Sequence, residues 1–143
     1  MTDAREWGEP EVIRRILADC RTWAVVGLGD NPMRPAFGVA RFLRQMGKRI
    51  VPVHPDAPAV LGETGYPTLA DIPFAVDCVD VFRRADAAGR FADEAVKIGA
   101  RAVWFQLGVV DSAAFARTRA AGVDMVMDHC PHIEWPRFGP IGH

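Results

Sequence analysis

The sequence lacks the features that mark membrane, disulfide-bonded and nucleic-acid-binding proteins. Its 3 cysteines, Cys20, Cys78 and Cys130, are odd in number and far apart, which fits neither a disulfide framework nor a C-x-x-C metal site. No apolar run approaches the length of a membrane span, and the acidic, polar start of the chain is unlike a secretory signal. Because 17 basic and 18 acidic residues nearly cancel, we expect no broad attraction to nucleic acid. These absences predict a cytoplasmic protein without membrane attachment.

Catalytic and metal-binding signatures are also missing. The sequence contains no Ser/His/Asp arrangement typical of hydrolases and no Walker lysine. Residues 128–134, DHCPHIE, cluster several possible metal ligands, but side chains two residues apart share a face only in extended chain, Pro131 intervenes and no second ligand pair exists. We therefore expect no metal site and no catalysis, and the cluster is interpreted as C-terminal packing. A reactive Cys130 near the ligand edge is an alternative, although no activating partner is visible.

What the sequence does contain is a regular alternation of short apolar runs with amphipathic stretches. At 143 residues, 50% of them hydrophobic and 24% charged, the chain can bury the core of one domain, expected to span residues 1–143. The alternation is typical of βαβ units, and apolar runs without polar alternation are typical of parallel strands. The predicted strands are Trp23–Leu28, Arg49–Val53, Cys78–Phe82, Ala102–Phe105 and Val123–Met127. The predicted helices are Glu11–Ala18, Pro35–Gln45, Leu69–Ile72, Ala85–Ile98 and Ser112–Ala121.

These elements predict a three-layer α/β fold. Right-handed crossovers arrange the strands as a doubly wound, five-stranded parallel sheet, most simply in the order 3-2-1-4-5, with helices on both faces. A sheet of this kind binds ligands beyond the carboxyl ends of its strands. The candidate positions are therefore those that follow each strand, namely residues 27–35, 54–55, 82–84, 106–108 and 128–132.

The loop after the first predicted strand, VVGLGDNPMRP, is an incomplete dinucleotide-binding turn. Gly27 and Gly29 match the first two glycines of G-x-G-x-x-G, but Pro32 stands at the third. A glycine turn between a strand and a helix lets backbone N–H groups approach a diphosphate at the helix amino end, and Arg34 can pair with phosphate oxygens. A tight turn that serves only the fold is the alternative.

The end of the second predicted strand bears on which nucleotide binds. NAD sites normally carry Asp or Glu there, where a carboxylate accepts from the ribose hydroxyls, but this chain has His54 and Pro55. Asp56 comes two residues too late for that role. An imidazole can donate to, or pair with, a ribose-bound phosphate, although His54 can also be a solvated loop residue. The pattern argues against NAD and leaves NADP and coenzyme A (CoA).

The order and spacing of longer segments are more specific than the glycine motif. These segments are VVGLGDNPMRPAFGVARFL, IVPVHP, VDVFRR, AVWFQLGVV and DMVMDHCPHIEWPRFG. In them the chain resembles the small stand-alone CoA-binding-domain proteins, which are relatives of the N-terminal domain of the succinyl-CoA synthetase alpha subunit. The resemblance implies a Rossmann-like fold that binds CoA or an acyl-CoA. We expect no ligase chemistry, because the phosphorylatable-histidine domain of the larger synthetases has no counterpart here.

The resemblance also implies where each part of the ligand binds. It assigns the diphosphate to residues 27–35, with the pantetheine arm leaving past 106–108. The adenosine end is assigned to residues near 53–55 and 82–84. The cofactor-binding residues that it implies are Gly27, Leu28, Gly29, Asn31, Arg34, Pro35, Val53, His54, Pro55, Phe82, Arg83, Gln106 and Gly108.

Two departures from the family pattern affect the phosphate contacts. Relatives often carry Ser at the positions of Gly29 and Ala36, so two hydroxyl contacts to phosphate have no counterpart, although backbone N–H groups can replace them. Many relatives have Asn where this chain has His54, which changes how the adenosine phosphate can be held.

Two other functions remain as alternatives. An NADP-dependent reductase would need a nicotinamide site and a hydride acceptor, for which the sequence offers no residues. An interaction module would instead report its bound CoA to a protein partner, whose identity the sequence does not indicate.

Overall fold

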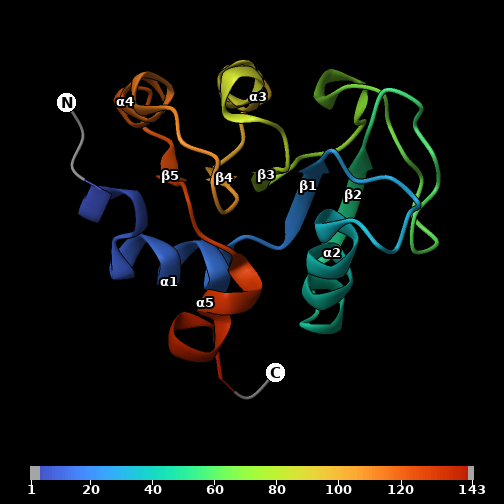
Figure 1. Cartoon of the computed structure of the whole chain (residues 1–143), viewed down its shortest axis with the longest axis horizontal. Coiled ribbons are helices and arrows are strands. Elements are labelled where there is room, and N and C mark those ends of the chain that lie inside the picture. Colours follow the sequence, from blue (N-terminus) through green and yellow to red (C-terminus); the bar gives the residue numbers. More distant parts are fainter. Residues whose placement is uncertain (1–3, 142–143) are drawn as a thin grey trace.

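The computed structural model describes residues 4–141 and contains one parallel sheet of five strands (Figure 1). The strands lie in the order β2-β1-β3-β4-β5, and each neighbouring pair is parallel. Their bounds are β1 (Thr22–Val26), β2 (Arg49–Val53), β3 (Cys78–Val81), β4 (Ala102–Phe105) and β5 (Asp124–Val126). The predicted α/β, Rossmann-like class is therefore confirmed.

Helices cover both faces of the sheet, as Figure 1 shows with the sheet seen edge-on. One face carries α1 (Pro10–Asp19), α2 (Pro35–Gln45) and α5 (Pro131–Phe138), and the other carries α3 (Ala85–Lys97) and α4 (Ser112–Ala120). Two short 3-10 helices, η1 (Ala4–Gly8) and η2 (Leu69–Asp71), complete the described elements. In residues 4–141 no helix combines the length and the apolar character needed to cross a bilayer.

The strands are buried on both faces, which explains why their sequences lack polar alternation. In β4, Ala102 and Trp104 pack with residues of α1, α2 and α5, whereas Val103 and Phe105 pack with residues of α3 and α4. All four side chains are buried. The apolar runs read from the sequence therefore locate the strands to within two residues at each end.

The predicted strand order 3-2-1-4-5 is wrong, because β3 lies on the other side of β1. The connection from β2 to β3, residues 54–77, has η2 as its only helix among the described elements and runs to the far side of β1. Asp77 fixes the start of β3 there, since its Oδ2 accepts from the N–H groups of Arg21 (2.9 Å) and Thr22 (3.0 Å). Its own N–H donates to the Thr22 carbonyl oxygen over 2.9 Å. The rule of right-handed crossovers permits both strand orders, so these long-range contacts determine which order forms.

The observed order moves the switch point of the sheet to the gap between β1 and β3. The connection that leaves β1 runs through α2 on one face, and the connection that leaves β3 runs through α3 on the other. Two adjacent parallel strands whose connections leave on opposite faces open a crevice at their carboxyl ends. The loop after β1 and the residues after β3 therefore border the expected ligand position.

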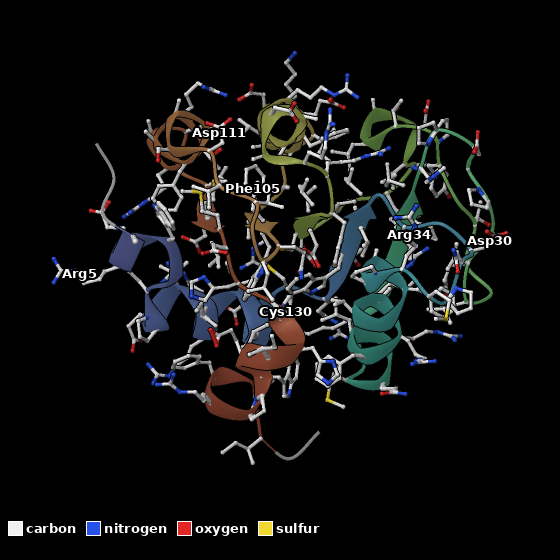
Figure 2. All side chains as sticks on the ribbon, in the orientation of Figure 1. Arg5, Asp30, Arg34, Phe105, Asp111 and Cys130 are labelled. Carbon is white, nitrogen blue, oxygen red and sulfur yellow. The ribbon has the colours of Figure 1, made fainter. Side chains whose placement is uncertain are left out.

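The C-terminal cluster contains a helix that the sequence analysis does not predict. Pro131 occupies the first turn of α5, where its fixed φ is favourable and its missing N–H costs nothing. The helix packs against α1 and α2, and Trp135 is buried there. Because of this helix, the residue before it, Cys130, is held at the carboxyl edge of the sheet (Figure 2).

Candidate functional site

A cleft of about 910 Å³ opens at the carboxyl edge of the sheet. This volume lies in the range of about 300 to 1,000 Å³ that is usual for small-molecule sites. The lining combines the loop after β1, the amino end of α2 and residues that follow β2, β3, β4 and β5. The expected site residues that line it are Gly27, Gly29, Asn31, Arg34, Pro35, His54, Phe82, Arg83 and Gln106.

The two glycines of the loop have different structural reasons. Gly27 has a φ of +95°, and a Cβ built on it would lie 2.7 Å from the carbonyl oxygen of Phe82. A side chain there would collide with the backbone at the end of β3. A Cβ on Gly29 would lie 3.7 Å from Cδ2 of His54, an ordinary van der Waals distance. Gly27 is therefore required by the meeting of β1 and β3, whereas Gly29 borders the cleft with room to spare.

The rest of the loop is held by Asn31. Its Oδ1 accepts from the N–H of Met33 over 3.0 Å, and its carbonyl oxygen accepts from the N–H of Arg34 over 3.2 Å. Asn31 thus builds the turn itself, as Asn commonly does. The turn delivers Arg34 and Pro35 to the start of α2, whose amino end borders the cleft with its partial positive charge.

Two arginines and two aspartates bring opposite charges to the cleft. Arg34 comes from the start of α2 (Figure 2) and Arg83 from the end of β3. Neither guanidinium forms an ion pair or hydrogen bond with another residue in the 4–141 range. Asp30 and Asp56 also line the cleft, so its net charge is not strongly positive. An anion would therefore bind at the positions of the two unpaired guanidiniums, since the net charge of the cleft alone does not attract it.

His54 is oriented by the residue two positions further on. Its Nδ1 accepts from the backbone N–H of Asp56 over 3.1 Å and lies 3.8 Å from Asp56 Oδ2. In a neutral imidazole with an accepting Nδ1, the proton is on Nε2, which then donates. The ring lies beside Gly29. His54 therefore presents a hydrogen-bond donor without needing to be protonated.

Some expected residues lie outside the lining of the cleft. The Leu28 side chain is fully buried in the core. Val53 and Pro55 line a neighbouring pocket of about 180 Å³, which shares His54 and Arg83 with the cleft. The cleft and this pocket therefore adjoin each other at His54 and Arg83.

Gly108 binds the loop that follows β5. Its N–H donates to Asp128 Oδ1 over 2.7 Å, and the two residues have φ values of 79° and 62°. Positive φ is uncommon outside glycine, although Asp tolerates it. The bond ties the loop after β4 to the loop that carries Cys130. Leu107 and Val109, on either side of Gly108, do line the cleft.

Gln106 and Cys130 are the most buried polar groups of the cleft, and each is 7% exposed. The Oε1 atom of Gln106 is buried and has no hydrogen-bond partner among the described residues. A buried acceptor without a donor is costly, so this atom favours a ligand that supplies one. Cys130 is a free thiol.

The other side chains of the DHCPHIE cluster make several separate contacts. The Nδ1 atom of His129 lies 2.8 Å from the Met127 carbonyl oxygen, while His132 stacks on Phe42 with ring centroids 3.9 Å apart. Within residues 4–141, no three His, Cys, Asp or Glu side chains are grouped so that they could hold a metal ion. Of these side chains, His129 and Glu134 lie close together, with Nε2 and Oε1 3.7 Å apart, whereas His132 lies on Phe42.

Several residues that line the cleft are not among the cofactor-binding residues expected from the sequence. Cys130 is expected near the ligand edge from its position after the fifth strand, and a range after the fourth strand that is one residue longer would include Val109. Asp56 and Pro58 belong to the irregular β2–β3 connection, whose path no local pattern indicates. The lining residues absent from the expected cofactor-binding set are Asp30, Ala36, Val39, Asp56, Pro58, Leu107, Val109 and Cys130. Asp30, Leu107 and Cys130 do lie within the candidate ranges that follow the predicted strands.

A parallel sheet with order 2-1-3-4-5, a glycine turn after β1 and a cleft at the switch point define an α/β protein of the Rossmann-like class. Within that class, residues 21–136 match the CoA binding domain family, and the chain belongs to this family.

Individual proteins are similar to this chain in sequence or in fold. The chain is 33% identical over 118 residues to the uncharacterized protein YneT of Bacillus subtilis strain 168, covering 82% of this chain and 87% of YneT. A hypothetical protein from Pyrococcus horikoshii OT3 superposes with a TM-score of 0.88 at 32% identity, over 96% of this chain and 97% of that one. The dinucleotide-forming acetyl-coenzyme A synthetase 1 of Ca. Korarchaeum cryptofilum shares the fold, with a TM-score of 0.66 at 20% identity, over 78% of this chain and 26% of the synthetase.

Proposed function

We propose that this protein binds coenzyme A or an acyl-CoA in the cleft and catalyses no reaction of its own. The observation that carries the proposal is the presence, in one cleft, of a helix amino end and two guanidiniums without carboxylate partners among the described residues. These are the groups that hold a diphosphate. Membership of the CoA binding domain family supports the same ligand.

The proposed diphosphate position is beside the loop of residues 27–35. Arg34 pairs with its oxygens there, and the amino end of α2 adds its partial positive charge. Because Gly29 has no side chain, the ligand can approach the backbone of the loop closely. This arrangement compensates for the serine hydroxyls that the loop lacks.

The proposed adenosine position is the junction between the cleft and the pocket of Val53 and Pro55. His54 donates from Nε2 to the ribose 3′-phosphate, and Arg83 supplies positive charge from the carboxyl end of β3. The pocket is partly apolar, with Val26 and Phe91 among its lining, which suits the faces of an adenine ring.

The proposed path of the pantetheine arm runs past Gln106. The arm contains two amide groups, so an amide N–H can donate to the unpaired Oε1 of Gln106. Its alkyl parts suit the apolar side chains of Val39 and Val109, which line the same cleft. The contact with Gln106 would distinguish CoA from ligands that stop at the diphosphate.

Release of bound ligand tests the proposal directly. The purified protein is denatured, and the released small molecules are identified by mass. Titration calorimetry on ligand-free protein then measures the dissociation constants of CoA, acetyl-CoA and NADP. We expect a CoA species in the released fraction. We also expect CoA to bind at least about tenfold tighter than NADP, a difference in binding free energy of about 1.4 kcal/mol.

The alternatives correspond to other outcomes of these measurements. Enriched NADP without a CoA species would contradict the proposal and favour a reductase. CoA binding together with capture of a partner that depends on added CoA would extend it to an interaction module.

A further inference from the structure

We propose that Cys130 exchanges with a disulfide of CoA in the cleft, so that the protein holds CoA as a mixed disulfide. This inference rests on the proposed function, because the cleft must first bind the nucleotide part of the same ligand. It adds a covalent, redox-dependent mode of retention to reversible binding.

The position of Cys130 distinguishes it from the other cysteines. Cys130 lines the cleft that contains Arg34 and Gln106, directly before α5. Cys20 and Cys78 are buried in the core, 3% and 0% exposed, and neither lines the cleft. Burial also raises the pKa of the Cys78 thiol well above its ordinary value, which keeps that sulfur protonated and unreactive. Of the cysteines, Cys130 alone combines a thiol with access to the cleft.

Gln106 supplies an independent indication that a ligand occupies this part of the cleft. Its side chain is 7% exposed and lines the cleft, and its buried Oε1 has no partner among the described residues. A pantetheine amide that satisfies this oxygen places the thiol end of the same arm in the compartment that Cys130 lines. The pantetheine amide that binds Gln106 and the sulfur that reacts with Cys130 then belong to the same arm of the ligand.

The amino end of α5 suits the charge that develops during the exchange. Cys130 is the residue that precedes the first turn of this helix, and its side chain makes no capping hydrogen bond. Helix amino ends favour negative charge, so both the attacking sulfur and the transient anionic sulfurs are stabilised there. Neither His129 nor His132 is needed, since both have other contacts.

The step balances without a further oxidant. The Cys130 thiolate attacks one sulfur of CoA disulfide, the bond between Sγ and that sulfur forms, and the original S–S bond breaks. The other CoA leaves as a thiolate and takes up the proton that Cys130 lost. The CoA disulfide is the oxidant, and it is reduced to one free CoA for each Cys130 that becomes part of a disulfide.

The test uses the full chain, reduced and freed of ligand, and CoA disulfide as the reagent. Intact-mass measurement without reductant should show the protein with one added CoA, less two hydrogen atoms. Dithiothreitol should remove this adduct. Peptide mapping should locate it on Cys130. The rate should exceed that with oxidised glutathione by at least about tenfold, because the bound nucleotide raises the local concentration of the disulfide. Cys130→Ser should form no adduct, and Arg34→Ala should lower the CoA disulfide rate toward that of glutathione.

Dethio-CoA, which has no thiol, separates failure of this inference from failure of the proposed function. Suppose that reduced wild-type protein binds dethio-CoA. If it then forms no adduct with CoA disulfide, or reacts equally fast with oxidised glutathione, the exchange is overturned while the proposed function stands. An adduct found on Cys20 or Cys78 also overturns it. Absence of both dethio-CoA binding and adduct overturns the two proposals together.

Discussion

Along β3, one unpaired polar group lies within the strand and another lies just past its carboxyl end, and the two groups differ in what can satisfy them. At its carboxyl end, Arg83 lines the cleft, where a ligand can reach it. In its middle, Asp80 is fully buried between Val25 and Trp104 of the neighbouring strands, and neither carboxyl oxygen has a partner among the described residues. Burial raises the pKa of Asp80 well above its ordinary value, so protonation relieves the charge.

This difference separates two kinds of consequence. An unpaired group at the edge of the cleft is available to a ligand, and changing it should alter binding with little effect on folding. An unpaired group in the core is available only to a proton, and changing it should alter how stability depends on pH. Gly27 and Gly29 divide in the same way, because one meets β3 and the other borders the cleft.

The largest effect is expected from Gly27→Ala, on folding. The new methyl group would lie 2.7 Å from the Phe82 carbonyl oxygen, at a φ of +95°. Left-handed backbone strain and the displacement of a packed neighbour together should lower the free energy of unfolding by about 2 to 4 kcal/mol. Urea denaturation measures this change.

Gly29→Ala is the matched control for Gly27→Ala. Its methyl group has an ordinary contact with His54, so the free energy of unfolding should change by no more than about 0.5 kcal/mol. Equal stabilities of the two variants would contradict the assignment of Gly27 to the meeting of β1 and β3.

The next largest effect is expected from Arg34→Ala, on binding. Loss of a charge-assisted contact with the diphosphate should cost about 1.5 to 3 kcal/mol, so CoA affinity should fall about tenfold or more. Arg84→Ala is the control, because Arg84 pairs with Asp86 and does not line the cleft. Calorimetry on both variants, with urea denaturation to show equal stability, checks the prediction. Unchanged CoA affinity in folded Arg34→Ala would remove Arg34 from the site.

Asp80→Asn should remove a pH dependence of stability. The folded-state pKa of Asp80 is raised, so its contribution to stability is complete below the unfolded pKa, near 3.9, and is lost as pH rises toward the folded value. Over that interval wild type should lose about 1.4 kcal/mol per pH unit relative to Asp80→Asn, which stays neutral. Denaturation curves at stepwise pH values from 4 upward measure the difference. If stability changes with pH in the same way in wild type and in Asp80→Asn, then Asp80 keeps its charge in the folded protein. The affinity of Asp80→Asn for CoA should equal that of wild type.

Local patterns predicted the strands and the helices α1 to α4, but not η1 or α5, because each pattern depends on nearby residues. The start of α2 at Pro35 and the span of β2 follow from residues within one element. The strand order does not, since it depends on Asp77 binding the start of β1 across the long β2–β3 connection. A sequence that satisfies the handedness rule in two ways needs such a contact to choose between them.

The expected site residues that the structure brings into one cleft are those whose position is imposed by the sheet. Parallel strands bring their carboxyl ends to one edge, so residues directly after β1, β2 and β3 could be expected in one cleft. Expected residues lie outside the lining of the cleft where a side chain alternates or a loop returns. Leu28, between two glycines of the cleft, points into the core. Gly108 gives its N–H to Asp128, which lies 20 residues further along the chain.

The smallest effect is expected at His54, on the discrimination between CoA and dephospho-CoA. Because Nδ1 accepts from the Asp56 N–H, the neutral ring can donate from Nε2 to the 3′-phosphate. His54→Ala should therefore reduce the preference for CoA by about fivefold, which is about 1 kcal/mol for a partly exposed hydrogen bond.

Two isosteric substitutions identify the nitrogen involved. The amide nitrogen of Gln can occupy the position of Nε2, whereas that of Asn reaches only the position of Nδ1. His54→Gln should therefore keep most of the preference for CoA, and His54→Asn should lose it as His54→Ala does. The ratio of the two dissociation constants, measured by calorimetry at one pH for wild type and the three variants, reports which nitrogen supplies the donor. The same ratio in wild type and all three variants would mean that the 3′-phosphate is held elsewhere. Arg83, which faces the same junction of cleft and pocket, would then be the residue to change next.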